Sequence, residues 1–222
     1  MNPNYAAVSR PRLNTLDANK VLKNTYMLLS ATLAFSAVMA MVSMYINMPP
    51  MAYLVSVIVA IVLGMFVLPK TANSSAGIGV IFLITGLLGF GLGSILTVYV
   101  AMANGPQIIA TALGGTGIIF LGLSGYALTT KKDFSFLGGF LFAGMMVIVL
   151  AIIASLFIQI PALALTISAA IIMLMSGMIL FDTSRIINGG ETNYIMATYS
   201  IFLSLFNIFI SLLNILGIMS SD

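Results

Sequence analysis

The last apolar stretch of the chain carries a regular series of hydroxyl and amide side chains. The spacings between them are four, three, four and three residues, which places all of them on one face of a helix. Each polar group that faced hydrocarbon without a hydrogen-bond partner would cost several kcal/mol. We therefore expect this polar stripe to face the interior of a helix bundle, either as interhelical hydrogen bonds or as the wall of a polar path. The stripe consists of Ser200, Ser204, Asn207, Ser211 and Asn214.

One acidic residue falls near the end of the preceding apolar stretch. Asp182 lies 21 residues after Pro161, about 31 Å along a helix, and a hydrocarbon core is about 30 Å thick. Arg185 follows on the same helical face. The two residues form either an ion pair at the membrane rim or, with Asp182 at the inner mouth of a polar path, a gate that binds cations. Lys70 is a candidate basic partner for Asp182 at this mouth.

Several reaction types are excluded by the composition. The chain has neither His nor Cys, so it lacks a Ser-His-Asp triad, an H-E-x-x-H zinc site and a disulfide framework. An aspartyl dyad needs two neighbouring carboxylates, and only Asp182 is available within an apolar stretch. We therefore expect no enzyme activity and no cofactor.

The overall composition is that of an integral membrane protein. The chain is 61% hydrophobic and 6% charged, with a mean hydropathy of +1.18, and a helical span needs about 20 apolar residues. These values predict an all-α bundle of seven transmembrane helices in residues 20–222, after a polar, disordered cytoplasmic tail at residues 1–19. The predicted spans are Asn24–Ile46, Met51–Leu68, Gly77–Ala101, Gln107–Leu128, Phe136–Ile158, Ala162–Phe181 and Tyr194–Met219.

The basic residues predict the orientation of these spans. They fall in four groups, each separated from the next by two apolar stretches and an uncharged turn. Because cytoplasmic loops carry an excess of Lys and Arg, we expect the N-terminus in the cytoplasm and the C-terminus outside. The bilayer, with its anionic lipid, explains the net charge of +3 better than nucleic acid does. The groups are Arg10, Arg12, Lys20 and Lys23; Lys70; Lys131 and Lys132; and Arg185.

Short turns and glycines predict how the spans pack. The uncharged outer turns favour tight antiparallel hairpins of spans 1–2, 3–4 and 5–6. Glycines recur in the third and fourth spans, where close backbone approach holds helices together in lipid, so we expect them at helix contacts. They are Gly79, Gly86, Gly89 and Gly93 in the third span, and Gly114, Gly115, Gly117, Gly122 and Gly125 in the fourth.

Three segments of the predicted cytoplasmic face resemble the Bax-inhibitor (transmembrane BAX inhibitor motif) family. They are residues 22–26, 129–139 and 189–194, and they are most similar to bacterial members that modulate the membrane protease FtsH. The resemblance implies a multi-pass protein of the bacterial inner membrane, with six helices around a central seventh and a periplasmic C-terminus. It also implies association with FtsH and its accessory membrane proteins, which limits degradation of membrane substrates.

The resemblance implies an alternative function as well. Some members of the family are pH-sensitive calcium leak channels that sense pH through two Asp residues. The first matches Asp182, and the second falls at Ser204, in a segment that keeps the family's Asn as Asn207. A hydroxyl does not ionise in this range, so the shared-proton pair is broken. The alternative is thus a calcium or cation leak channel with Asp182 at its gate and Ca²⁺ as ligand.

Overall fold

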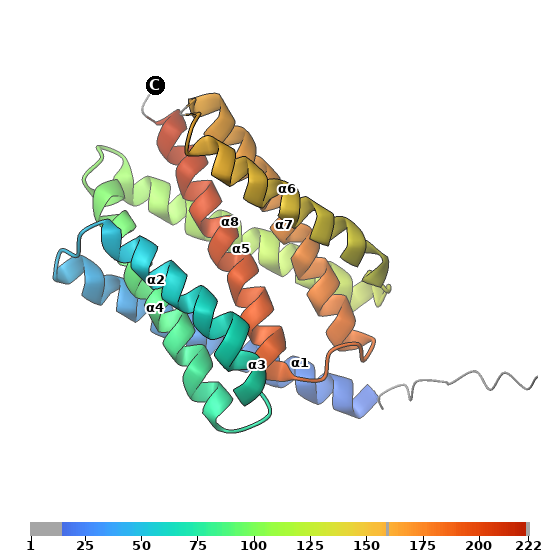
Figure 1. Cartoon of the computed structure of the whole chain (residues 1–222). Coiled ribbons are helices and arrows are strands. Elements are labelled where there is room, and N and C mark those ends of the chain that lie inside the picture. Colours follow the sequence, from blue (N-terminus) through green and yellow to red (C-terminus); the bar gives the residue numbers. More distant parts are fainter. Residues whose placement is uncertain (1–14, 159, 221–222) are drawn as a thin grey trace, which may run out of the picture.

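The computed structural model describes residues 15–158 and 160–220, and within these ranges the chain is helical without strands (Figure 1). Seven stretches are long and apolar enough to cross a membrane, which confirms the predicted all-α class and the seven transmembrane helices. The elements are α1 (Thr15–Tyr45), α2 (Met51–Val62), a π-helical turn (Leu63–Val67), α3 (Leu68–Thr71), α4 (Ala76–Val100), α5 (Gly105–Thr130), a 3-10 turn (Ser135–Leu137), α6 (Gly138–Ser155), α7 (Pro161–Ile187) and α8 (Tyr194–Met219).

The ends of the helices follow local backbone chemistry. Pro161 is the first residue of α7, where its missing N–H costs nothing. After α5, Lys131 adopts a left-handed conformation (φ 51°), and after α7, Gly189 does so (φ 76°), which stops each helix. α7 runs six residues beyond the predicted Phe181 and therefore includes Asp182. α1 begins at Thr15, so residues 15–19 of the expected tail are helical; residues 1–14 lie outside the described ranges.

The second span contains a widened turn. The N–H of Leu68 bonds to the carbonyl of Leu63, five residues back. Pro69 follows and has no N–H with which to continue the α-helical pattern. Inside this turn Gly64 lies against the hydroxyl of Tyr199 on α8, so closely that a Cβ at this position would clash with that oxygen. The π-helical turn and its glycine thus bring the second span against the last helix.

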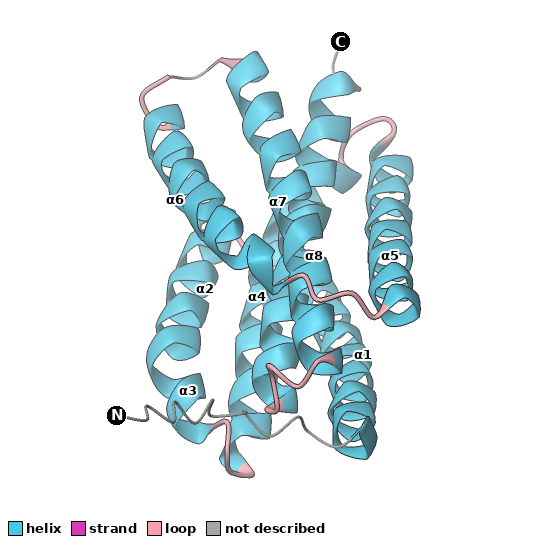
Figure 2. Ribbon diagram, turned by 90° about the vertical axis from the view of Figure 1, so that its right-hand side faces the viewer, coloured by secondary structure: helices cyan, strands magenta, loops and turns pink. Residues whose placement is uncertain are grey.

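α8 occupies the interior of the bundle (Figure 2). It contacts α1, α4, α5 and α7. In an 18-residue apolar stretch of α8, 56% of the residues are buried, and the share in α4 is the same. The central position expected for the seventh helix is therefore confirmed for α8, and α4 is buried to the same extent. α6 is the most peripheral span. It packs on α7 and on the 3-10 turn, and 6% of the residues in its 18-residue apolar stretch are buried.

Of the predicted hairpins, α6–α7 is confirmed and α4–α5 form a minor contact, whereas the α1–α2 hairpin is wrong. α1 and α2 both pack on α4 rather than on each other, and α5 packs mainly on α8 and α7. The reason lies in α4, because its small residues let α1 and α2 pack closely against it. This close packing decides which helices are neighbours, and the short connecting turns do not. A Cβ on Gly89 would overlap the carbonyl oxygen of Ser36, one on Gly93 would overlap that of Ala40, and Gly91 lies against Ser56 of α2.

The expectation that glycines mark helix contacts is confirmed for three of the four glycines named in α4 and is wrong for Gly79 and for most of those named in α5. In α4, Gly86, Gly89 and Gly93 all lie against α1. Of the five α5 glycines named from the sequence, a Cβ would meet only a leucine side chain at Gly115 and no atom within 4 Å at the other four. Those four open positions are Gly114, Gly117, Gly122 and Gly125.

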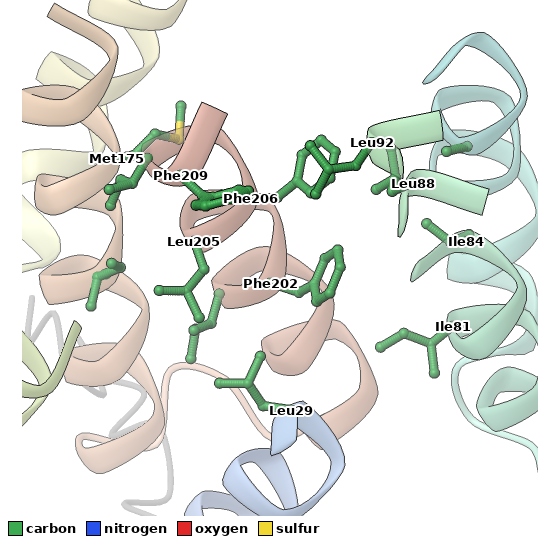
Figure 3. Close-up of a cluster of buried hydrophobic side chains, with 14 of the residues drawn as sticks. Leu29, Ile81, Ile84, Leu88, Leu92, Met175, Phe202, Leu205, Phe206 and Phe209 are labelled. Carbon is green, nitrogen blue, oxygen red and sulfur yellow. The ribbon is translucent and has the colours of Figure 1, made fainter. Parts of the chain in front are cut away.

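The apolar core lies between α8 and α4 (Figure 3). Phe202 and Phe206 of α8 stack with ring centroids 6.1 Å apart, and both are nearly fully buried. The side chains of Ile84 and Leu88 on α4 complete this layer. Because this apolar face of α8 is directed at α4, its polar stripe is turned toward α7 and the second span. The core therefore sets the direction in which the stripe points.

Candidate functional site

The polar stripe of α8 lies inside the bundle. Ser204 and Ser211 are buried, with exposed fractions of 2% and 3%, and the other three members are half-buried. Two members bond to their own helix: Ser204 Oγ donates to the Ser200 carbonyl at 3.1 Å, and Asn207 Nδ2 donates to the Leu203 carbonyl at 2.8 Å. These local bonds satisfy polar groups without holding another helix.

Two members of the stripe reach α7. Ser200 Oγ donates to Asp182 Oδ2 at 2.5 Å, and Asn214 Nδ2 donates to Ser168 Oγ at 2.8 Å. Bonds of this kind between membrane helices contribute about 0.6 kcal/mol each on average. The stripe therefore combines interhelical bonds at its two ends with bonds to its own helix between them.

Asp182 is buried between α7 and α8, with 7% of its surface exposed. Arg185 does not pair with it, in contrast to the rim ion pair that we considered from the sequence. Instead Arg185 Nη2 lies 3.6 Å from Glu191 Oε2 and donates to the Gly190 carbonyl at 3.0 Å. The left-handed residue Gly189 turns the chain back after α7 and delivers Glu191 to Arg185. Asp182 is thus left facing the stripe.

A cavity of about 390 Å³ opens beside Asp182, and we call it the Asp182 cavity. Its polar wall contains the carboxylate and the first three members of the stripe, and Arg185 and Glu191 lie at its edge. Lys70 is exposed on α3 and is not among the lining residues, so the structure does not place it as the partner of Asp182. The lining residues are Met145, Met175, Met178, Asp182, Arg185, Glu191, Met196, Ala197, Tyr199, Ser200, Leu203, Ser204 and Asn207.

A second cavity of about 330 Å³ holds the rest of the stripe. Ser211 and Asn214 line it together with Ser168, Tyr53 and Tyr99. It shares no lining residue with the Asp182 cavity. Asn207, the last stripe member of one cavity, and Ser211, the first of the other, are four positions apart, which is about 6 Å along the helix. The stripe therefore serves two separate polar chambers rather than one continuous passage.

The end of the bundle that bears the charged loops, here called the basic end, is held together by two side chains. The first is Asn193, which caps α8 by accepting from the N–H groups of Ile195 and Met196 at 2.9 and 3.1 Å. Its amide also donates to the Ala72 carbonyl at 3.0 Å and to Asn73 Oδ1 at 2.8 Å. One residue thus joins the start of α8 to the loop before α4.

Ser184 of α7 fixes the loop between α5 and α6. Its Oγ accepts from the N–H of Phe134 at 2.8 Å and donates to the Lys132 carbonyl at 3.1 Å. Within the loop, hydrogen bonds from the side chain and backbone of Ser135 hold the pKa of Asp133 below its usual range. The carboxylate therefore stays charged beside the two lysines at neutral pH, and the loop presents mixed charge at the basic end.

The chemistry available to the Asp182 cavity is coordination and hydrogen bonding. The carboxylates of Asp182 and Glu191, several hydroxyls and one amide offer oxygen ligands of the type that hard cations use. Within residues 15–158 and 160–220 no group of three or more His, Cys, Asp or Glu side chains is placed to hold a metal ion. Any cation here would therefore keep much of its hydration.

Comparison with known proteins places this fold in a family. A family model described as "Inhibitor of apoptosis-promoting Bax1" matches residues 18–221. The chain belongs to the Bax inhibitor family. The resemblance drawn from residues 22–26, 129–139 and 189–194 is thereby confirmed, and two of these three segments contain the contacts of Ser184 and Asn193 just described.

Bacterial relatives within the Bax inhibitor family match over almost their whole length. A membrane protein of Vibrio cholerae is 52% identical over 208 residues, covering 94% of this chain and 93% of that protein. The "Modulator of FtsH protease YccA" of Escherichia coli is 50% identical over 214 residues, covering 96% of this chain and 97% of that protein. The chain is therefore a multi-pass membrane protein close to YccA.

Several residues of the site were not found from the sequence. The four methionines of the Asp182 cavity come from three helices, and no sequence spacing connects them. Tyr199 is the neighbour of Ser200 in the sequence but does not follow the spacing of the polar stripe. Its position is seen only in the structure, from its close contact with Gly64 and from the lining of the cavity. Glu191 was visible as a loop acid, but its pairing with Arg185 depends on the turn at Gly189.

Proposed function

We propose that this chain binds the FtsH protease and its accessory membrane proteins and limits the degradation of membrane substrates. The observation that carries the proposal is the 50% identity to the Escherichia coli modulator of FtsH protease over 97% of that protein. Identity of this extent covers all seven spans and their loops. The protein would act from the inner membrane, with its N-terminus in the cytoplasm and its C-terminus in the periplasm.

The basic end supports this proposal. Its loops are fixed by Asn193 and Ser184, so they form a defined surface that a partner can recognise without paying an ordering cost. Every charged residue of the described chain lies at this end. Residues 1–19, or the part of them that precedes α1, would be the segment that the protease engages.

The test is made in cells that contain FtsH. We expect the tagged protein to co-purify with FtsH and, when abundant, to lengthen the half-life of another membrane substrate several-fold. A variant that lacks residues 2–14 keeps the whole of α1 and should lose the effect if the tail is the engaged segment. Pulse-chase labelling measures the half-life. If the full chain neither co-purified with FtsH nor changed the half-life of the membrane substrate, the proposal would be contradicted.

A calcium or cation leak is a second candidate, favoured by the burial of Asp182 against the stripe. The carboxylate, Ser204 and Asn207 line one cavity near the basic end, and a second polar chamber lies farther along α8. Conduction would require the residues between the two chambers to part. Because Ser204 occupies the position of the family's second Asp, Asp182 alone would supply the charge of the gate.

We expect Asp182→Asn to change calcium flux into liposomes several-fold. The substitution removes the carboxylate beside the stripe and leaves Glu191 as the remaining acid among the described residues of the Asp182 cavity. Asp133→Asn is the matched control, since Asp133 is an exposed acid of the basic end outside the cavity. A calcium-sensitive dye inside the liposomes reports the flux. Flux no greater than in protein-free liposomes between about pH 6 and 8, the range where a proton-sharing pair would act, would contradict this candidate.

A further inference from the structure

An apolar groove runs between α1 and α5, on the side of α8 opposite to the polar stripe. It consists of two cavities, of about 440 and 350 Å³, that share Leu33 and Phe120 as lining residues. The floor of the larger cavity is formed by Phe202 and Phe206 of α8. All of its walls belong to membrane-length helices. We call this feature the α1–α5 groove.

A buried hydroxyl lies at one end of the groove. Tyr26 lines the smaller cavity, and its ring meets Phe120 edge-on, with centroids 5.9 Å apart. Its phenol oxygen is buried and has no hydrogen-bond partner in the part of the chain that the structure describes. Buried polar atoms are nearly always paired, so this oxygen has a hydrogen-bonding capacity that the described residues leave unused. Ser124 lines the same cavity and bonds instead to Thr183 at 3.4 Å.

Positive charge surrounds this end of the groove. Lys23 lies one turn before Tyr26 on α1 and is exposed. On the other side, Lys131 and Lys132 follow directly after α5 ends at Thr130, and both are exposed. The groove is thus apolar along its length, carries an unpaired phenol near the basic end, and opens there among three lysines.

We propose that the α1–α5 groove binds one phospholipid with an anionic head group. The phosphate lies among Lys23, Lys131 and Lys132, Tyr26 donates to a phosphate or ester oxygen, and an acyl chain fills the apolar cavities. The groove extends about 27 Å from Tyr26 to Met44, at 1.5 Å per residue. A partner helix about 10 Å wide over that length would need several times the volume of the two cavities, so a single hydrocarbon chain fits better.

Glycines of α5 provide a matched pair of variants. Gly125 lines the groove and Gly122 does not, yet a Cβ at either position would meet no atom within 4 Å. The backbone therefore leaves room for a Cβ at both positions, and only Gly125→Leu places its side chain in the groove. Native mass spectrometry of the detergent-purified protein with added phosphatidylglycerol or phosphatidylcholine measures the bound lipid.

We expect the natural chain to retain one phosphatidylglycerol in preference to phosphatidylcholine. Gly125→Leu should lose it and Gly122→Leu should keep it. Tyr26→Phe should weaken retention about tenfold, as expected for a lost hydrogen bond to a charged group, and Lys23→Gln should reduce the preference for the anionic lipid. Thermal unfolding of each variant checks that the fold is intact.

Three results would overturn the proposal. The first is equal retention of phosphatidylglycerol by Gly125→Leu and Gly122→Leu, which would describe lipid bound elsewhere on the bundle. The second is no retention by the natural chain. The third is a dimer that Gly125→Leu alone dissociates, because the groove would then hold a second copy of the chain.

Discussion

Gly89→Leu is expected to separate α1 from α4 and to lower the free energy of unfolding by about 3 kcal/mol or more. A Cβ at this position would overlap the carbonyl oxygen of Ser36, with the Ser36 hydroxyl close by. A backbone oxygen within a helix cannot rotate away, so the whole of α1 must move. Because α1 and α4 form the most extensive helix contact of the described chain, that movement disrupts the core.

The matched control is Gly79→Leu in the same helix. Gly79 is exposed, and a Cβ there would meet no atom within 4 Å, so this variant should match the natural chain or exceed its stability slightly through helix propensity. Thermal unfolding in detergent and the amount of protein accumulated in membranes report both variants. A Gly89→Leu protein as stable as Gly79→Leu would show that the α1–α4 contact is not close-packed.

Asn193→Ala is expected to lower the free energy of unfolding by about 2–4 kcal/mol. The substitution removes a helix cap, which is typically worth about 1 kcal/mol, and two bonds to the loop before α4 that contribute about 0.5–1.5 kcal/mol each. The bonds in question join the amide to the Ala72 carbonyl and to Asn73 Oδ1. Chemical unfolding in detergent, with hydrogen exchange of the amides at the start of α8, measures the loss.

Asn193→Asp divides this effect into its parts. An aspartate still accepts from the N–H groups of Ile195 and Met196, but it cannot donate to the Ala72 carbonyl. We therefore expect a stability between those of Asn193→Ala and the natural chain, with the start of α8 still protected from exchange. Equal instability of the two variants would contradict the prediction, because it would assign the whole effect to the bonds with the loop and none to the helix cap.

Much of the architecture was predictable because membrane solvation acts on every residue of a span. Seven apolar stretches predicted seven helices, and Tyr194–Met219 was predicted with the bounds that α8 has. The interior position of the polar stripe followed from the cost of unpaired groups in hydrocarbon. These conclusions depend on the hydropathy summed over spans of about 20 residues, so no single contact between side chains affects them.

Individual contacts were not predictable in the same way. The glycines of α4 and α5 look alike in the sequence, yet Gly89 packs against a backbone and Gly122 meets nothing within 4 Å. Arg185 was matched to Asp182 by helical spacing, but the turn at Gly189 brought Glu191 to it instead. In each case the outcome depends on which partner the rest of the fold supplies, and the spacing of residues along one helix carries no such information.

The peripheral position of α6 has a consequence for access to the Asp182 cavity. α6 supplies Met145 to the cavity wall, yet it packs on α7 and the 3-10 turn and on no other span extensively. A sideways displacement of α6 would thus unroof the chamber toward the lipid while α1, α4 and α8 kept their packing. The methionines at this wall are flexible enough to reseal around a new shape. Of the helices that line this chamber, α6 is therefore the one whose displacement would disturb the fewest other helix contacts.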